Sequence, residues 1–293
     1  MPLVMLAPAR PAVAQIFETV GIRAQGMGGA FVAVADDATA TWWNPAGLAT
    51  GPYFDALIEY DRIRTSPQRN VKGVAVVFPA LGVSYYHLPI NYMRAPSPTE
   101  SAATRREDQG ALSVYGLTFG QSVGAHLVFA STVKAARAGD THTDLDLGGL
   151  AKFGPVQLGV TVKNVREPTF DSDRGTFAMD RQARAGAALI GRTSGLVSAL
   201  TLAVDADVIT TATARGDVRH VAGGLEAWLF ERKLGLRVGA SGNTVGTKGS
   251  SASGGVSVVI ASGAYVKTYV DTQYTNGSDE TRRSWGVALR ATF

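Results

Sequence analysis

The chain has 293 residues, of which 45% are hydrophobic, 18% are charged and 34 are glycine. A soluble globular domain usually carries about 25% charged residues, and the low charge of this chain argues against disorder. No apolar run reaches the roughly 18 residues that a membrane helix needs, which excludes a helical membrane protein. The chain contains no cysteine, which excludes a disulfide framework, a thiol nucleophile and a cysteine-ligated metal site.

The charge balance gives no sign of a nucleic-acid partner. The sequence pI is about 9.4, but the net charge is only +4, and the 28 basic residues are scattered along the chain. Nucleic-acid-binding domains gather Lys and Arg on one face. We therefore expect no nucleic acid among the partners.

The N-terminus contains Ala12-Val13-Ala14 before Gln15, an A-x-A pattern of the kind that signal peptidase cleaves. The stretch before it is apolar, but it has no basic start and Arg10 and prolines interrupt it. We interpret residues 1–14 as the remnant of a signal peptide whose start lies upstream, with an ordinary disordered N-terminus as the alternative. Export agrees with the absence of cysteine.

From about residue 53 the chain alternates between polar and apolar residues with period two, and turn residues interrupt it at short intervals. No segment has a sustained apolar stripe with a period of 3.6 residues, so the pattern predicts strands. The last segment is typical, with Val287 and Leu289 on one face and Arg290 on the other. The fourteen predicted strands span residues 53–61, 69–78, 81–93, 108–119, 123–136, 143–153, 156–165, 181–190, 196–208, 217–229, 234–243, 251–260, 265–275 and 281–293.

Short and long connections alternate between these strands. The long links include 94–107 and 166–180, which are rich in Pro, Arg, Asp and Ser. Outer-membrane barrels have short periplasmic turns and longer extracellular loops, and closure leaves no unpaired strand edge in the bilayer. The sequence therefore predicts an all-β fold, a transmembrane antiparallel β-barrel of about fourteen strands over residues 53–293; a soluble all-β domain is the alternative. The predicted short turns are Pro79-Ala80, Gly120-Gln121-Ser122, Gly154-Pro155, 191–195, 230–233 and 261–264.

The two faces of the strands differ in chemistry. We expect the apolar faces to meet lipid, with Trp228, Tyr274, Trp285 and Phe293 as candidates for the interfacial aromatic girdles. A mid-depth Arg or Lys on the lipid face would cost about 2–4 kcal/mol, so the charged faces must line the lumen, where we expect structural ion pairs. The predicted lumen charges are Asp144, Asp146, Lys152, Lys163, Arg184, Asp205, Asp207, Glu226, Arg237, Lys267 and Asp271.

Residues 21–49 precede the first strand and read GIRAQGMGGAFVAVADDATATWWNPAGLA. Their first glycines allow close backbone approach and positive φ. Asn before Pro favours an extended or turn conformation, and the glycine after it permits a reversal. Two adjacent aspartates can accept hydrogen bonds from amides or lumen arginines. A phosphate loop is disfavoured because no Lys-Ser/Thr follows the glycines. The residues concerned are Gly26, Gly28, Gly29, Asp36, Asp37, Asn44, Pro45 and Gly47.

This segment strongly resembles the N-terminal segment of the FadL family of outer-membrane transporters and of the related PorV/PorQ-type barrels. The resemblance rests on the glycines, the run 30–35, the Asp-Asp-Ala step and the motif at 44–48, and it continues more weakly to Phe293. It implies that residues 15–52 form a hatch that plugs the lumen and that the barrel-assembly machinery reads Phe293. It also implies an integral protein of the outer membrane of a Gram-negative-type bacterium, in contact with outer-membrane lipid and lipopolysaccharide.

The resemblance implies passive uptake of small hydrophobic, fatty-acid-like molecules across the outer membrane, and hence an apolar small-molecule ligand. The glycine pairs at 148–149, 223–224 and 254–255 are candidates for a bulge or a lateral gap in the wall, although such a pair more often just relieves crowding in a tight barrel. Two alternatives remain, a PorV-type barrel that docks or shuttles a secreted-protein partner at the cell surface, and a structural barrel without cargo. The two long links are poor material for an apolar capture groove because they carry Arg94, Arg105, Arg106, Asp171, Asp173 and Arg174.

Nothing in the sequence indicates catalysis. The four histidines, His87, His126, His142 and His220, have no second ligand at a metal-site spacing. There is no Gly-x-Ser-x-Gly elbow, and Ser131 lies an odd number of residues from His126, so the two face opposite sides of a strand. We expect no enzymatic activity, no catalytic residues, no metal and no cofactor.

Overall fold

The computed structural model describes residues 20–63, 70–93, 107–173, 175–213, 216–246, 248–263, 265–278 and 283–293. Three short helical segments precede the strands: α1 (Ile22–Gly26), α2 (Ala40–Trp43) and the 3-10 helix η2 (Pro45–Thr50). The first strands are β1 (Asp55–Ile63), β2 (Asn70–Phe78), β3 (Leu81–Met93), β4 (Glu107–Val123), β5 (Leu127–Ala138), β6 (Asp140–Phe153), β7 (Val156–Lys163), β8 (Thr169–Ser172) and β9 (Gly175–Ala178). They are followed by β10 (Gln182–Arg192), β11 (Val197–Asp207), β12 (Thr211–Thr213), β13 (Gly216–Val218), β14 (His220–Leu229), β15 (Leu234–Asn243), β16 (Ser250–Ser262), β17 (Lys267–Gly277) and β18 (Ser284–Thr292).

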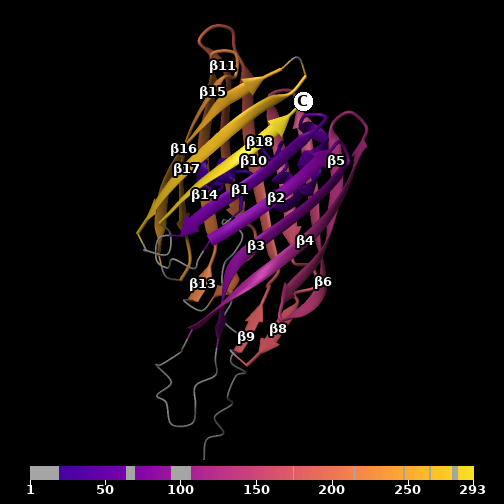
Figure 1. Ribbon diagram of the computed structural model, residues 1–293, viewed down its shortest axis with the longest axis vertical. Helices are drawn as coiled ribbons and strands as arrows, with labels where there is room; N and C mark the ends of the chain where they lie inside the picture. Colours follow the sequence, from indigo (N-terminus) through magenta and orange to yellow (C-terminus); the bar gives the residue numbers. More distant parts are fainter. Residues whose placement is uncertain are drawn as a thin grey trace, which may run out of the picture.

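Fourteen of these strands form a closed antiparallel barrel (Figure 1). Strands that are neighbours in the barrel follow one another in the chain, apart from two short hairpins, β8–β9 and β12–β13, which are not members of the ring. Pairing of β1 with β18, which sets Asp55 opposite Thr292, closes the sheet. Closure matters because an open edge would leave a row of unpaired backbone groups. None of the helices in the described residues is long and apolar enough to cross a membrane.

The two faces of the barrel wall invert the usual distribution of residues. On the outer face Ile58, Phe129 and Val238 are 60%, 56% and 58% exposed. On the inner face Asp146 and Glu226 are 0% and 1% exposed. In a soluble protein apolar residues fill the interior and charged residues are almost never fully buried unless they are paired. The alternation predicted from the sequence is therefore present, with the charged face inward.

Most predicted strand limits agree with the structure to within a few residues. The segments predicted at 81–93 and 234–243 coincide with β3 and β15. Two predicted turns are also present, with Ala80 and Gly154 in the left-handed region at φ 68° and 60°. The turns at Ala80 and Gly154 and the C-terminus lie at the same end of the barrel, which we call the short-turn end.

Two connections differ from the prediction. The turn expected at Gly120-Gln121-Ser122 is wrong, because β4 continues to Val123 and the chain reverses at Gly124, where φ is 65°. At the opposite end, which we call the long-link end, Gly139 alone joins β5 to β6 with φ 92°. A positive φ at glycine allows such tight reversals without steric cost. The strict alternation of short and long connections is therefore not present.

Two long links contain strands that the sequence analysis missed. The link predicted at 166–180 contains the hairpin β8–β9, and the chain between β11 and β14 contains β12–β13. Residues 216–218, most of which fall in the predicted strand 217–229, belong to this second hairpin. These strands have only three or four residues each, too few for a period of two to stand out.

Three sets of predicted features lie wholly or partly outside the described residues. They are the signal-peptide remnant at 1–14, the start of the predicted hatch at 15–19, and the link at 94–106 with its arginines. At the other terminus, Phe293 exchanges two 3.0 Å backbone hydrogen bonds with Phe54 and stacks on its ring at 5.2 Å. Its role as an assembly signal stays a prediction.

Candidate functional site

The described part of the N-terminal segment, residues 20–51, is almost entirely buried and hydrogen-bonds to the inner face of the barrel wall. Acidic side chains of the wall accept hydrogen bonds from backbone amides of this segment. Glu59 on β1 accepts from Gly21 at 3.0 Å, and Asp205 on β11 accepts from Phe31 at 2.7 Å. The contacts continue through β5, β6, β16 and β17. Each of these two acidic side chains accepts from two consecutive amides of the segment, and together they fix its path.

Arg23 on α1 is the centre of an ion-pair network between this segment and the wall. Its Nε and one terminal nitrogen donate to the two oxygens of Glu226 on β14 at 2.8 and 2.6 Å. Its other terminal nitrogen contacts Asp36 and lies 3.2 Å from Asp37. Arg290 on β18 approaches Asp37 to 3.6 Å. Asp37 thus meets a wall arginine as expected, whereas the ion pair of Asp36 is with Arg23. The sequence analysis did not single out Arg23, which is the main partner of both aspartates.

The same network continues around the wall. Arg237 lies 3.8 Å from Glu226 and 3.4 Å from Asp271. Arg290 lies 3.7 Å from Asp271. Acidic and basic side chains therefore alternate from α1 across β14, β15, β17 and β18, and each charge has partners of opposite sign. A buried ion pair is tolerated only when such partners compensate for the loss of water.

The charges of the network shift the pKa values of its members in the N-terminal segment. Burial raises the pKa of the Asp37 carboxyl, but Arg23 and Arg290 more than offset this, so the pKa lies below its ordinary value. For Arg23, burial lowers the pKa of the guanidinium, and the charges of Asp36 and Glu226 raise it well above its ordinary value. Both groups are therefore ionised at neutral pH.

A second set of buried charges lines the opposite part of the wall. Lys134 on β5 lies 3.0 and 2.6 Å from Asp144 and Asp146 on β6. Arg184 on β10 donates to Asp207 on β11 at 2.7 Å. The ammonium of Lys163 on β7 lies 3.4 Å above the ring of Trp42 in α2, a favourable cation–π contact.

Nearly all predicted lumen charges are buried on the inner face. Lys152 is partly exposed. The prediction that Lys267 faces the lumen is wrong, because this residue is the first of β17 and is exposed at the short-turn end. The buried ones, all 7% exposed or less, are Asp144, Asp146, Lys163, Arg184, Asp205, Asp207, Glu226, Arg237 and Asp271.

The prediction that Trp228 belongs to an interfacial aromatic girdle is wrong. It is only 3% exposed and contacts Tyr269 edge-on at 5.7 Å on the inner face. It lies two residues from Glu226, and in a strand such residues share a face. Tyr274, Trp285 and Phe293 are 49%, 43% and 47% exposed.

Asn44 organises the end of the N-terminal segment. Its amide donates to the carbonyls of Val32 at 2.8 Å and Gly149 on β6 at 3.1 Å, and its side-chain oxygen accepts from Ala46. It thereby caps η2, with Pro45 in the first helical position. The prediction that the chain reverses at Gly47 is wrong. This glycine lies within η2, where a Cβ would stand 1.7 Å from the carbonyl oxygen of Ala35.

The glycines of the motif differ in their roles. Gly28 and Gly29 have φ of 69° and 84°, as expected. Gly26 does not have a positive φ; it faces Gly255 on β16, and a Cβ at Gly26 would lie 3.5 Å from that glycine's Cα. A Cβ at Gly26 would thus be at ordinary contact distance, and neither turn conformation nor close approach requires glycine there. At Gly28 both apply, because a Cβ would also lie 2.7 Å from the backbone nitrogen of Ala240 on β15.

The glycine pairs of the strands make no lateral gap, because the strand pairing continues through all three. One glycine of each pair faces inward into a close contact instead. A Cβ at Gly148 would lie 2.2 Å from Asn44 Oδ1, and one at Gly224 would lie 2.4 Å from the carbonyl oxygen of Met27. A Cβ at Gly255 would lie 2.5 Å from the carbonyl oxygen of Thr272. The prediction of a lateral gap at these positions is therefore wrong, and the alternative prediction, that the glycines relieve crowding, is confirmed.

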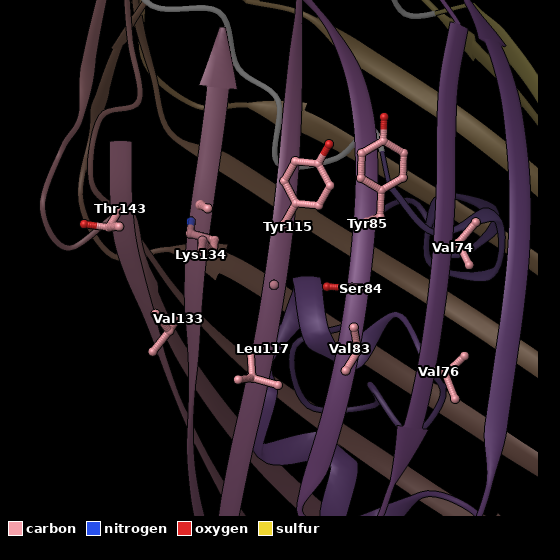
Figure 2. A pocket seen from close by; sticks show the side chains of 12 residues that line it. Val74, Val76, Val83, Ser84, Tyr85, Tyr115, Leu117, Val133, Lys134 and Thr143 are labelled. Carbon is pink, nitrogen blue, oxygen red and sulfur yellow. The ribbon is translucent and has the colours of Figure 1, made fainter. Parts of the chain in front are cut away.

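A groove of about 450 Å³ lies on the outer face of the wall, over β2 to β6 (Figure 2). Tyr85 and Tyr115 project from adjacent strands at its edge, and the helical ribbon of the N-terminal segment lies behind the strands. Ser84 and Gly116, which form part of its floor, are paired across β3 and β4. The groove therefore faces outward and is separated from the interior by a continuous sheet.

The histidines have structural contacts. His87 lies 3.2 Å from Ser113, His126 lies 2.8 Å from the Lys152 carbonyl, and His142 contacts Phe170. His220 is buried, and its backbone amide donates to Asp207. Within the described residues no group of three or more His, Cys, Asp or Glu side chains could hold a metal ion.

Three solved structures resemble the whole barrel. CymD, a monoaromatic hydrocarbon channel, has a TM-score of 0.61 at 12% identity, with 96% of this chain and 99% of that chain covered. The toluene transporter TbuX of Ralstonia pickettii has a TM-score of 0.62 at 12% identity, over 94% and 98%. The toluene transporter TodX of Pseudomonas putida has a TM-score of 0.56 at 11% identity, over 93% and 96%. These proteins are FadL-family hydrocarbon transporters, and the likeness shows a common barrel fold.

Sequence comparisons are less informative. A model of the TraF protein of the F plasmid transfer operon matches residues 113–207, which begin in β4 and end with β11. Among curated protein sequences, none matches the chain.

The neighbouring residues Gly223 and Gly224 provide a test of the close contact with the N-terminal segment. We expect Gly224→Ala to destabilise the folded barrel by about 1–3 kcal/mol, since a methyl group there overpacks the contact with Met27. Gly223→Ala is the control, because a Cβ added at this position would lie 4.0 Å from its nearest neighbour, the carbonyl oxygen of Ala203. We expect its free energy of unfolding to change by no more than about 0.5 kcal/mol. The measurement is the free energy of unfolding in detergent. Equal effects of both substitutions would contradict the contact.

Arg23→Ala should loosen the N-terminal segment. Removal of one partner from a buried ion pair typically costs about 3–5 kcal/mol, because Glu226 would keep its charge without its bidentate partner. We expect faster chymotrypsin cleavage after Phe31 and Trp42, which are 0% and 2% exposed in the intact chain. Arg181→Ala is the control, because its ion pair with Glu167 is exposed and contributes only about 0–1 kcal/mol. Unchanged protection of the segment in Arg23→Ala would show that the network does not hold it.

The lowered pKa of Asp37 predicts loosening of the segment in acid. Because the folded-state pKa lies below the unfolded value of about 3.9, the stabilisation is complete above about pH 4. It is lost as the pH falls through the lowered pKa. Fluorescence of Trp42 and Trp43, in a background with Trp228→Phe and Trp285→Phe, should report this transition. Asp37→Asn should be loosened already at pH 7 and respond less to acid; an acid response equal to that of the parent would assign the transition to another group.

Proposed function

We propose that this chain is an outer-membrane channel for passive uptake of small hydrophobic molecules. The observation that carries the proposal is the inverted wall, apolar and exposed outside and charged and buried inside. Such a wall suits hydrocarbon, where charged residues on the lipid face would be destabilising. The likeness to hydrocarbon channels over more than nine tenths of this chain supports the proposal.

We further propose that the N-terminal segment is a plug, as the predicted hatch at 15–52 would be. Its contacts with β1, β6, β11, β14 and β16 support this role, because they reach strands on all sides of the ring. Passage would require the segment to shift against the wall. Water entering the network can replace the ion pairs one at a time, so no external energy source is needed.

An uncharged molecule of about one aromatic ring suits this barrel better than a long fatty acid. The structures that it resembles are described as channels or transporters for monoaromatic hydrocarbons and toluene. At the long-link end, the exposed side chains of the hairpin β8–β9 include the charged Asp171. An extended apolar groove for a long acyl chain has no counterpart in these segments.

The test is uptake of radiolabelled toluene by intact cells of a Gram-negative host without its own hydrocarbon channels. Cells that make the chain should take up toluene several-fold faster than cells with the empty vector, because lipopolysaccharide slows apolar molecules. Deletion of residues 20–50 should raise the single-channel conductance in planar bilayers if this segment is the plug. Heat-modifiable migration on gels controls for folding.

Equal toluene uptake with and without the chain would contradict the channel. In that case native mass spectrometry of the chain extracted from its membrane would distinguish the alternatives. A stoichiometric protein partner would support a docking role like that of the PorV-type barrels, whereas the bare chain would support a structural barrel.

A further inference from the structure

The inward-facing residues of β3 contact different parts of the chain along the length of the strand. Near the short-turn end, a Cβ at Gly82 would contact Thr41 and Leu48 of the N-terminal segment, and Tyr86 contacts the ring of Trp42. Further along, Leu88 and Ile90 are 0% and 2% exposed, although the described N-terminal segment is in contact with earlier residues of the strand. The next inward-facing residue of the strand, Tyr92, is also buried, at 4% exposed.

The covering element at the end of β3 is the hairpin β8–β9. Phe170 and Phe177 are both 0% exposed, and Phe177 contacts the ring of Tyr92 edge-on at 6.4 Å. Phe170 contacts His142 at 4.9 Å. Ala136 on β5 is paired with His142, and Leu88 on β3 is paired with Leu112 on β4, two residues from the inward-facing Ile90. The hairpin thus places two aromatic rings against an apolar part of the inner wall, at the end away from the C-terminus (Figure 1).

The position of the hairpin in the chain shows that it crosses the lumen. It follows β7 and precedes β10, which are neighbours in the barrel, yet β9 pairs with β3, four strands away from β7. Because Tyr92 and Ile90 face inward, the hairpin reaches β3 over the mouth of the barrel and not around its outside.

The two ends of the hairpin are attached in different ways. At its base, Arg166 donates to Asp144 at 3.0 Å through its backbone amide, and the Asn164 amide donates to the Asp180 carbonyl at 2.9 Å. At its far end the strand pairing with the wall, among the described residues, is the residue pair Met93–Thr176, and the buried rings pack beside it. A polar base and an apolar end define a hinge that can open without breaking the ion pairs of the wall.

We propose that the hairpin β8–β9 is a lid over an apolar binding chamber formed by Leu88, Ile90, Leu112 and Ala136. A small uncharged ring compound binds there by replacing Phe170 and Phe177, so one buried apolar surface is exchanged for another. A charged ligand would lose its water without gaining a partner, since the Tyr92 hydroxyl already donates to the Ala138 carbonyl at 2.8 Å. This inference rests on the proposed function and names the site and the gate at the long-link end.

A disulfide staple tests the lid, and the natural chain has no cysteine to interfere. Met93→Cys with Thr176→Cys joins the lid to β3, because these residues are paired across the strands. Asp171→Cys with Thr176→Cys is the matched control, because it joins β8 to β9 within the hairpin and leaves the lid free. Paired residues in antiparallel strands are about 4.5–5.5 Å apart at Cα, within the range that a disulfide spans.

Oxidised cells with the first pair should take up toluene at the rate of cells without the chain, and a reductant should restore the rate. The control pair should keep the parental rate in both states. If the staple to β3 leaves uptake at the parental rate, the ligand does not pass beneath the lid and the lid is overturned, while the channel stands.

The chamber itself is tested without transport. In crystals soaked with iodobenzene, the anomalous signal of iodine should appear between Leu88, Ile90 and Leu112, with higher occupancy in Phe177→Ala, where a ring is already absent. No signal at this place in either protein would overturn the chamber. Iodobenzene in the chamber of a parent chain that takes up no toluene would instead leave the site standing and reject the proposed function.

Discussion

The structure depends on one constraint, that charged and polar groups facing the interior of the barrel must find partners there. The wall places Glu59, Asp205 and Glu226 inward with almost no exposure, and a buried charged or polar group without a partner is destabilising. The N-terminal segment supplies the missing partners, as backbone amides for the first two and as Arg23 for the third. Wall and segment therefore form one structure electrostatically, although 203 positions separate Arg23 from Glu226.

Steric fit reinforces this dependence. Where the backbone of the segment approaches most closely, the wall has glycine, and a Cβ at Gly239 would lie 2.1 Å from the carbonyl carbon of Met27. Glycine in a strand interior costs some stability, so its inward placement opposite Met27 indicates that the close approach outweighs that cost. Ion pairs set which strands the segment faces, and the glycines set how near it lies.

The strands and their inner faces could be predicted because period two marks the face of each residue, and Glu226 and Asp205 follow directly from it. The same rule would have placed Trp228 inward beside Glu226. The network of Arg23 could not be predicted, because periodicity assigns a face but not which strands meet across the lumen. The hairpin β8–β9 was missed for another reason: Phe170 and Phe177 each stand within a four-residue strand among polar residues, and their burial depends on β3, to which β9 is joined by one residue pair.

The two proposed covers of the interior differ in chemistry, and in the proposed channel this difference would order the events of passage. The lid at the long-link end is held by aromatic burial, so an apolar molecule can compete with Phe170 and Phe177 for the same surface. The contacts of the N-terminal segment with the wall are ion pairs and carboxylate–amide hydrogen bonds, with which a hydrocarbon cannot compete, because it offers neither charge nor hydrogen bonds. An apolar ligand can therefore open the first cover by its own binding energy, whereas the second yields only as water replaces the partners of Arg23. A chain built in this way would admit its ligand readily and release it slowly.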